Sequence, residues 1–192
     1  KSEFDKHRSF DHLLKNRPTS PKLLAMVFLE PSTRTRISFQ TAAYRLGLKS
    51  FVFDSAATTS LSKGETQSDT LKNIAAMLPD LMILRYGHSP DVDATIPLLD
   101  CPVINAGSGV TEHPTQALLD AYTIRQELGS VEGRRIAIVG DVKHSRVARS
   151  DVAAFTALGG QVTLVAPPTL LPHRLDDWPV EVSHDLDAVL PK

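Results

Sequence analysis

Short apolar runs alternate along the chain with longer segments in which apolar residues recur at helical spacing. The runs predict β-strands, and the longer segments predict α-helices that each bury one face. The predicted strands are residues 25–29, 51–53, 81–84, 103–106, 135–139 and 161–165. The predicted helices are residues 32–48, 65–78, 91–99, 113–128 and 145–158. This alternation predicts an α/β fold with parallel sheets and helices on both faces of each sheet.

A polar link at residues 129–133 is the expected domain boundary. A complete series of strands and helices precedes the link, and a new series begins after it. We therefore expect two domains, residues 1–129 and 130–192, each with a parallel β-sheet flanked by helices. The chain opens at Lys1 and stops at Lys192, just after an apparent helix has begun, so we expect the second domain to be incomplete.

Composition restricts the kinds of partner. With 42% apolar residues the chain can bury an ordinary core, and its 21 basic and 22 acidic residues leave a net charge of −1. The basic residues are scattered, so composition gives no electrostatic case for nucleic acid, and any anion site must be local. No apolar run approaches the roughly 20 residues of a membrane span, and no secretory signal is visible. We expect a cytoplasmic protein without a membrane partner.

Cysteine and histidine usage points away from disulfides and metals. The single cysteine, Cys101, excludes an internal disulfide framework and fits a reducing compartment. It precedes a predicted strand with no histidine or basic residue beside it, which favours a small buried apolar residue over a reactive thiol. The cysteine and histidines form no cluster with zinc spacing, so we expect no metal site.

Polar clusters follow the predicted strands, and ligands of open α/β sheets bind beyond the carboxyl ends of strands. The clusters are residues 30–36, 54–63, 85–88, 105–113 and 141–146. In the first, Ser32 and Thr33 suit capping of the following helix. Backbone N–H groups at a helix start, hydroxyls and a guanidinium suit phosphate. A plain cap leaves Arg34 and Arg36 at the helix end where the dipole disfavours positive charge, so the sequence favours a phosphate site.

The other clusters leave alternatives open. Lys63 is either a surface lysine or a point charge for an anion. Arg85 ends a strand predicted to be buried, where it needs either a ligand or a structural carboxylate. His113 is either a helix cap or, together with Gln116, a group that donates to a carbonyl oxygen and accepts from an NH₂ group. After Gly140 the dinucleotide pattern of glycines is absent, so Arg146 is better explained as a fork for a carboxylate ligand.

Over residues 20–165 the chain resembles the aspartate/ornithine carbamoyltransferase family. The resemblance is carried by Ser-Thr-Arg-Thr-Arg at residues 32–36 and His-Pro-Thr-Gln-Ala-Leu-Leu-Asp at residues 113–120. Pro31 and the Lys-Gly-Glu stretch at residues 63–65 are similar to the aspartate branch, because the ornithine branch usually has Lys in place of Pro31 and lacks that loop. The resemblance implies a carbamoyl-phosphate-binding domain (residues 1–129) and a partial aspartate-binding domain (residues 130–192). Three features depart from it: Ser108 stands where Asp is common, the loop before Lys63 is short, and family members continue further, with a second aspartate-binding arginine.

The resemblance also implies the site residues. The phosphate would be held by Ser32, Thr33, Arg34 and Thr35. Thr35, Arg85 and His113 would polarise the carbamoyl carbonyl, and Gln116 would accept from the carbamoyl NH₂. Arg146 would bind a carboxylate of L-aspartate, with Glu30 bracing Arg146. Ser60 (or its neighbour Thr59) and Lys63 would come from a neighbouring subunit.

The activity implied is transfer of the carbamoyl group of carbamoyl phosphate to the α-amine of L-aspartate, in pyrimidine biosynthesis, without metal or cofactor. Sites shared between subunits imply a homotrimer, either alone or joined by regulatory chains or a dihydroorotase. Two alternatives remain: a catalytically silent homologue that serves as an assembly subunit, and transfer to another amine such as ornithine.

Overall fold

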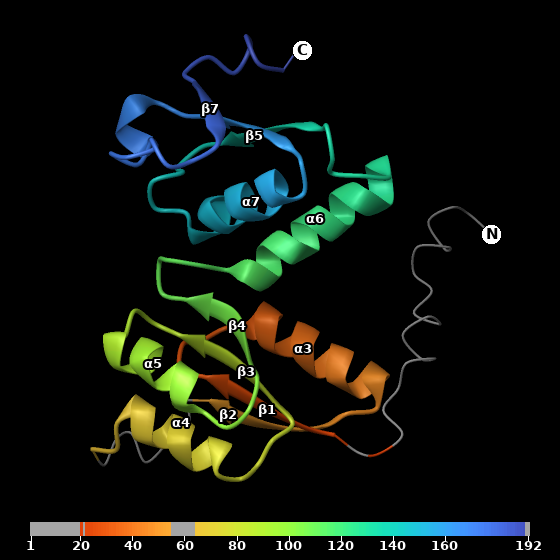
Figure 1. Ribbon diagram of the computed structural model, residues 1–192, viewed down its shortest axis with the longest axis vertical. Helices are drawn as coiled ribbons and strands as arrows, with labels where there is room; N and C mark the ends of the chain where they lie inside the picture. Colours follow the sequence, from red (N-terminus) through yellow and green to blue (C-terminus); the bar gives the residue numbers. More distant parts are fainter. Residues whose placement is uncertain (1–19, 21, 55–63, 191–192) are drawn as a thin grey trace, which may run out of the picture. The chain divides into compact units, whose positions relative to one another are not determined.

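The structure is a computed structural model that describes residue 20, residues 22–54 and residues 64–190 (Figure 1). It divides into two compact units, one up to Ala106 and one from Gly107 onward. Within the described part of the chain, no helix is long and apolar enough to cross a membrane. The same residues contain no group of three or more His, Cys, Asp or Glu side chains that could hold a metal ion.

The first unit is built on a four-stranded sheet with the strand order β2-β1-β3-β4. The strands are β1 (Leu23–Phe28), β2 (Lys49–Asp54), β3 (Leu81–Tyr86) and β4 (Val103–Ser108). Strand β1 pairs in parallel with both β2 and β3, so that Phe28 lies opposite Asp54 on one side and Arg85 on the other. The carboxyl ends of these three strands therefore meet at one edge of the sheet.

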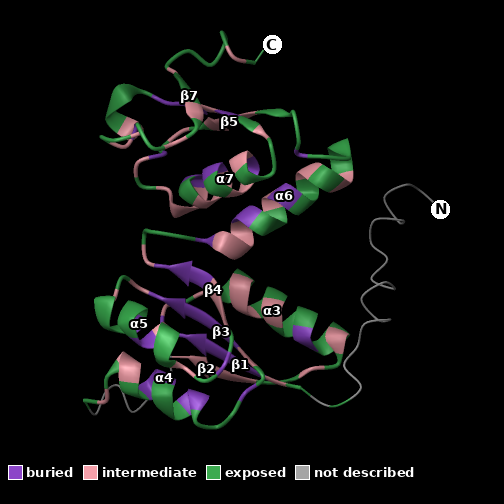
Figure 2. Ribbon diagram, viewed as in Figure 1, coloured by how far each residue is buried: buried purple, intermediate pink, exposed green. Residues whose placement is uncertain are grey.

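Helices cover both faces of this sheet (Figure 1). Helix α3 (Thr33–Leu46) packs on one face, where its buried Ala43 joins a cluster with alternate residues of β1 such as Met26. Helices α4 (Gln67–Ala75) and α5 (Pro90–Thr95) cover the other face, where Leu71 packs with Ala25. Because successive strand residues point to opposite faces, β1 is apolar along its whole length, and Figure 2 shows it buried.

The second unit contains a three-stranded parallel sheet in the order β5-β6-β7. In chain order its elements are α6 (Pro114–Leu128), β5 (Arg135–Val139), α7 (Arg146–Ala157), β6 (Gln161–Val165), the 3₁₀ turn η3 (Pro168–Leu170) and β7 (Val180–Ser183). Helix α6 packs against α7. Ala121 of α6, Phe155 of α7 and Leu164 of β6 belong to one buried apolar cluster.

Every strand and helix predicted between residues 25 and 165 is present, and the predicted α/β fold with parallel sheets is confirmed. The expected helix 91–99 is shorter: α5 ends at Thr95 and the 3₁₀ turn η2 (Ile96–Leu98) follows, because Pro97 cannot donate the next helical hydrogen bond. Strand β7 was not predicted. It has four residues and no buried side chain, so its pattern contains no apolar run. The expected C-terminal helix is a turn over the described residues.

The compact units and the predicted domains differ in which one contains helix α6. The sequence assigns it to a first domain that ends at residue 129, whereas in the structure it packs with α7 and lies in the unit that begins at Gly107. The division into residues 1–129 and 130–192 stays a prediction. Cys101 is buried in the core of the first unit, and burial raises the pKa of its thiol, as expected for a small core residue.

Candidate active site

The start of helix α3 is an exposed helix N-terminus that its own N-cap side chain does not close. Ser32 has extended backbone (φ −157°, ψ 101°), and its hydroxyl makes no capping hydrogen bond. The first helical hydrogen bond runs from the N–H of Arg36 to the carbonyl of Ser32 at 3.3 Å. The amides of Thr33, Arg34 and Thr35 therefore precede the helical ladder and carry the positive end of the helix dipole.

The two arginines of this first turn differ in their surroundings. Arg36 Nη1 lies 2.5 Å from Asp54 Oδ2, at the end of the neighbouring strand β2. Arg34 is exposed, and the first turn contains no acidic residue. Because Asp54 offsets the charge of Arg36, Arg34 is the cation that remains for an incoming anion at this helix start.

Three other helix starts are closed by a side chain. The hydroxyl of Thr66 accepts from the N–H of Asp69 at the start of α4 (3.0 Å), and Ser89 accepts from Val92 at α5 (3.4 Å). Ser145 accepts from Ala148 at α7 (3.1 Å). Among the α-helices that the structure describes, α3 and α6 start without such a bond. These two helices and their N-cap residues include six of the ten residues that the sequence predicts to bind substrate.

Arg85 lies at the carboxyl end of β3, beside the segment that leads into α3. Its side chain is buried, Nη1 donates to the carbonyl of Ala106 at 3.3 Å, and Nε lies 3.8 Å from Glu30 Oε2. The N–H of Leu29 donates to the carbonyl of Arg85 at 2.7 Å, which ties the ends of β1 and β3 together. The structure thus supplies the structural carboxylate, and it brings Arg85 to the same sheet edge as the start of α3.

Glu30 therefore has a neighbour that the sequence did not predict. The resemblance implies that it braces Arg146, but Glu30 belongs to the first unit and Arg146 to the second. Within the first unit, Glu30 lies beside the Arg85 guanidinium, and its carboxylate offsets the charge of that buried side chain. Bracing of Arg146 stays a prediction.

In the second unit, the start of α6 holds His113 and Gln116. His113 is the N-cap residue and is buried, and its imidazole does not cap the helix, which excludes the simple capping interpretation. Its backbone N–H donates to Ser150 Oγ of α7 at 2.9 Å. Gln116 Nε2 donates to Asp120 Oδ1 at 3.1 Å and to Oδ2 at 3.3 Å, one helical turn further on. Both predicted residues are held by neighbours on α6 and α7.

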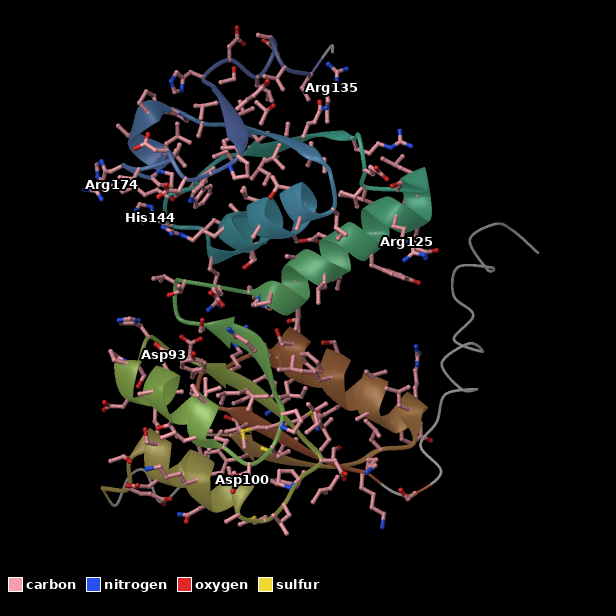
Figure 3. All side chains as sticks on the ribbon, viewed as in Figure 1. Asp93, Asp100, Arg125, Arg135, His144 and Arg174 are labelled. Carbon is pink, nitrogen blue, oxygen red and sulfur yellow. The ribbon has the colours of Figure 1, made fainter. Side chains whose placement is uncertain are left out.

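Arg146 is the first residue of α7, after a turn that is fixed by local hydrogen bonds. Its Nη1 donates to the carbonyl of Gly109, and Ser145 caps the helix. The same turn contains His144, which Figure 3 labels. His144 Nδ1 lies 3.0 Å from a carboxylate oxygen of Asp141. That side-chain bond first, and the backbone N–H of His144 second, lower the pKa of Asp141. These hydrogen bonds fix the backbone conformation of the turn that leads into Arg146.

Asp120 and Asp151 were not singled out by the sequence. Asp151 lies on α7, and its pKa is raised to about 6, first by burial and then by the charge of Asp120 and a side-chain hydrogen bond with it. The sequence signals concerned Asp120 alone, which closes the motif at residues 113–120 and lies four residues after Gln116 on a predicted helix. The pairing of Asp120 with Asp151 depends on how α6 packs against α7, which the sequence does not show.

The predicted site residues fall into two groups. The start of α3 (Ser32, Thr33, Arg34, Thr35) and Arg85 share one edge of the first sheet, and His113, Gln116 and Arg146 lie at the starts of α6 and α7 in the second unit. Ser60, its alternative Thr59, and Lys63 lie outside the described residues.

Comparison with known proteins gives consistent matches. Residues 2–126 match the family model of the aspartate/ornithine carbamoyltransferase carbamoyl-P binding domain. The chain is 55% identical over 166 residues to the aspartate carbamoyltransferase catalytic subunit of Thermobifida fusca, covering 86% of this chain and 53% of that protein. It is 51% identical over 186 residues to the corresponding subunit of Acidothermus cellulolyticus, covering 96% of this chain and 57% of that protein.

Solved structures agree with the sequence matches. Aspartate transcarbamoylase from Trypanosoma cruzi in complex with carbamoyl aspartate and phosphate superposes with a TM-score of 0.80 at 33% identity, over 97% of this chain and 64% of that one. The catalytic subunit of M. jannaschii aspartate transcarbamoylase gives 0.78 at 36% identity, with the same coverage. The chain spans just over half the length of the curated relatives that it matches. By its sequence and its fold, the chain belongs to the aspartate/ornithine carbamoyltransferase family.

Proposed function

We propose that this chain acts in aspartate carbamoyl transfer. The carbamoyl group of carbamoyl phosphate passes to the α-amine of L-aspartate, giving N-carbamoyl-L-aspartate and phosphate, a step of pyrimidine biosynthesis. The observation that carries the proposal is the start of α3, where a helix N-terminus with no side-chain cap and an exposed arginine lies at the same sheet edge as the buried Arg85. The relatives named aspartate carbamoyltransferase support it.

The first group of residues suits the phosphate. The N–H groups at the start of α3 point along the helix dipole, and the hydroxyls of Ser32, Thr33 and Thr35 add neutral donors. The guanidinium of Arg34 would add charge-assisted, bidentate hydrogen bonds to the phosphate oxygens. These donors compensate the charge that grows on the phosphate as its bond to the carbamoyl carbon breaks, so they stabilise the leaving group in the transition state.

Side chains from both groups suit the carbamoyl group. Arg85 and His113, with the hydroxyl of Thr35, would donate to the carbonyl oxygen, on which negative charge develops when the amine attacks. Gln116 would accept from the carbamoyl NH₂ and so fix its orientation. We propose that both groups of residues act on one bound carbamoyl phosphate. The reaction then needs no protein nucleophile, because positioning of the two substrates and stabilisation of charge supply the catalysis.

The aspartate-binding residue and the subunit assembly are inferred from the family. Arg146 would pair with a carboxylate of L-aspartate through its guanidinium fork. Ser60 and Lys63 would reach the phosphate from a neighbouring subunit, which requires a homotrimer, alone or joined by regulatory chains or a dihydroorotase. A cytoplasmic location fits the use of these soluble substrates.

A panel of acceptor amines tests the proposal. Radiolabelled carbamoyl phosphate is incubated with the chain and L-aspartate, L-ornithine or buffer alone, and the products are separated. We expect label in N-carbamoyl-L-aspartate only. Label in citrulline would assign the chain to ornithine, and no product together with no binding of carbamoyl phosphate by calorimetry would favour a silent assembly subunit.

A further inference from the structure

Asp120 is the partner of the side chain that is expected to recognise the carbamoyl NH₂. Gln116 Nε2 lies 3.1 Å from Asp120 Oδ1 and 3.3 Å from Oδ2, so the amide nitrogen faces both carboxylate oxygens. Gln116 and Asp120 are both half-buried on α6. Asp120 is not a capping residue, because it lies in the second turn of α6.

The chemistry of a carboxylate decides which way the amide points. An ionised carboxylate can only accept hydrogen bonds, whereas an amide has one end that donates and one that accepts. The nitrogen of Gln116 must therefore face Asp120, and Oε1 must face away from it. Without Asp120, rotation by half a turn about the last side-chain bond would exchange the two ends, and a group that turned its nitrogen toward a substrate NH₂ would repel it.

We propose that Asp120 is a positioning residue, which holds the Gln116 amide with its oxygen directed to the carbamoyl NH₂ and so gives the site its preference for carbamoyl over acyl phosphates. This inference deepens the proposed function and rests on it. Asp120 touches no substrate in this account and acts only through Gln116.

Helix α7 supports the arrangement from the other side. Ser150 accepts from the backbone N–H of His113, and the next residue, Asp151, interacts with Asp120. Burial first, and the neighbouring Asp120 carboxyl second, raise the pKa of Asp151. Ser150 and Asp151, which are adjacent on α7, therefore both interact with residues near the start of α6.

The simpler explanation is an ordinary Gln–Asp pair at i, i+4, which stabilises a helix by only a few tenths of a kcal/mol. The two explanations differ in what they predict for ligands. A helix-stabilising pair affects all ligands of α6 alike. A positioning residue affects only a ligand that carries the NH₂ group.

Acetyl phosphate is the matched ligand, because it has a methyl group where carbamoyl phosphate has NH₂. Calorimetric titrations of the full chain with both ligands give the ratio of their affinities. We expect the wild-type chain to prefer carbamoyl phosphate, and Asp120→Asn and Asp120→Ala to lower the ratio by about 3- to 10-fold while the affinity for acetyl phosphate stays within about 2-fold. Glu127→Gln is the control, since it removes an exposed acid from the same helix.

Gln116→Met sets the ratio expected when the amide is gone. In the double variant Gln116→Met/Asp120→Asn, the ratio should equal that of Gln116→Met alone, because Asp120 acts through Gln116. An Asp120→Asn chain that keeps the wild-type ratio, or loses affinity for both ligands equally, would overturn the inference and leave the proposed function standing. A wild-type chain that binds neither ligand would overturn both.

Discussion

Two kinds of helix start occur in this molecule. The starts of α4, α5 and α7 are closed by Thr66, Ser89 and Ser145, whose hydroxyls accept from a backbone N–H inside the first turn. The starts of α3 and α6 make no such bond, although Ser32, a good capping residue, precedes α3. Closed starts contribute to stability, because their donors are satisfied within the chain. The donors at the start of α3 stay available, and a ligand can use them. At the start of α6 the N–H of Gln116 already donates to the carbonyl of His113, so its side chains offer the contacts to a ligand.

The largest expected effect is at the open start of α3. Arg34→Ala removes the exposed cation beside the phosphate-binding amides, so we expect carbamoyl transfer to fall by a factor on the order of 10²–10³. The melting temperature should stay close to that of the wild type, because Arg34 is exposed. Initial rates with saturating aspartate and thermal unfolding by circular dichroism measure the two quantities. Near-normal turnover in this variant would contradict the assignment of the phosphate site.

The next effect concerns α7, which packs against α6. Asp151 has a pKa of about 6 in the folded chain against an ordinary value of 3.8. The folded state therefore holds this proton more tightly than the unfolded state, and its contribution is present below about pH 4 and lost as the pH rises through about 6. Asp151→Asn should raise the free energy of unfolding by about 1–3 kcal/mol at about pH 7 and change it little at about pH 4. Denaturant titrations at both pH values measure this, and an equal effect at both would contradict the burial of Asp151.

A pair of serine variants tests the comparison at matched chemistry. Ser145→Ala removes a capping bond and should lower the free energy of unfolding by about 1 kcal/mol. Ser32→Ala removes a hydroxyl that makes no capping bond, so we expect a smaller change in stability and a weaker affinity for phosphate. Urea unfolding and phosphate titration of both variants measure these differences. Equal losses of stability would show that the two helix starts are not different.

The smallest expected effect separates the two arginines of α3. Asp54→Asn removes the partner of Arg36 and should change the free energy of unfolding by less than about 1 kcal/mol, because the pair is partly exposed. Phosphate affinity should change far less than in Arg34→Ala, since Arg36 already lies at Asp54. Phosphate titration compares the variants. A loss as large as that of Arg34→Ala would mean that Arg36 contacts the ligand.

The regular part of the fold could be predicted from the sequence. A strand buried on both faces, such as β1, has a continuous apolar run, and the helices on its two faces have apolar residues at helical spacing. Strand β7 could not be found, because a short strand without buried side chains has no such run. The packing of α6 with α7 depends on side chains that meet only after folding, so the division between the compact units could not be read from the polar link at residues 129–133.

The candidate site was predictable where one short segment contains all of its groups. The start of α3 has its amides, hydroxyls and arginine within five residues, and the structure shows that segment at a helix start. The neighbour of Arg85 was left open between a ligand and a carboxylate, and the carboxylate is Glu30. Asp120 and Asp151 were missed because two acids on separate helices have no common pattern in the sequence.

The most direct test compares helix starts within one spectrum. In ¹H–¹⁵N correlation spectra of the chain, increasing concentrations of inorganic phosphate should shift the backbone amides of Thr33, Arg34 and Thr35 in a saturable way. The amides of Asp69 at α4 and Val92 at α5 already donate to capping hydroxyls and should stay in place. Saturable shifts confined to the start of α3 are the result that we predict. No shift at residues 33–35, or equal shifts at the capped starts, would contradict the account.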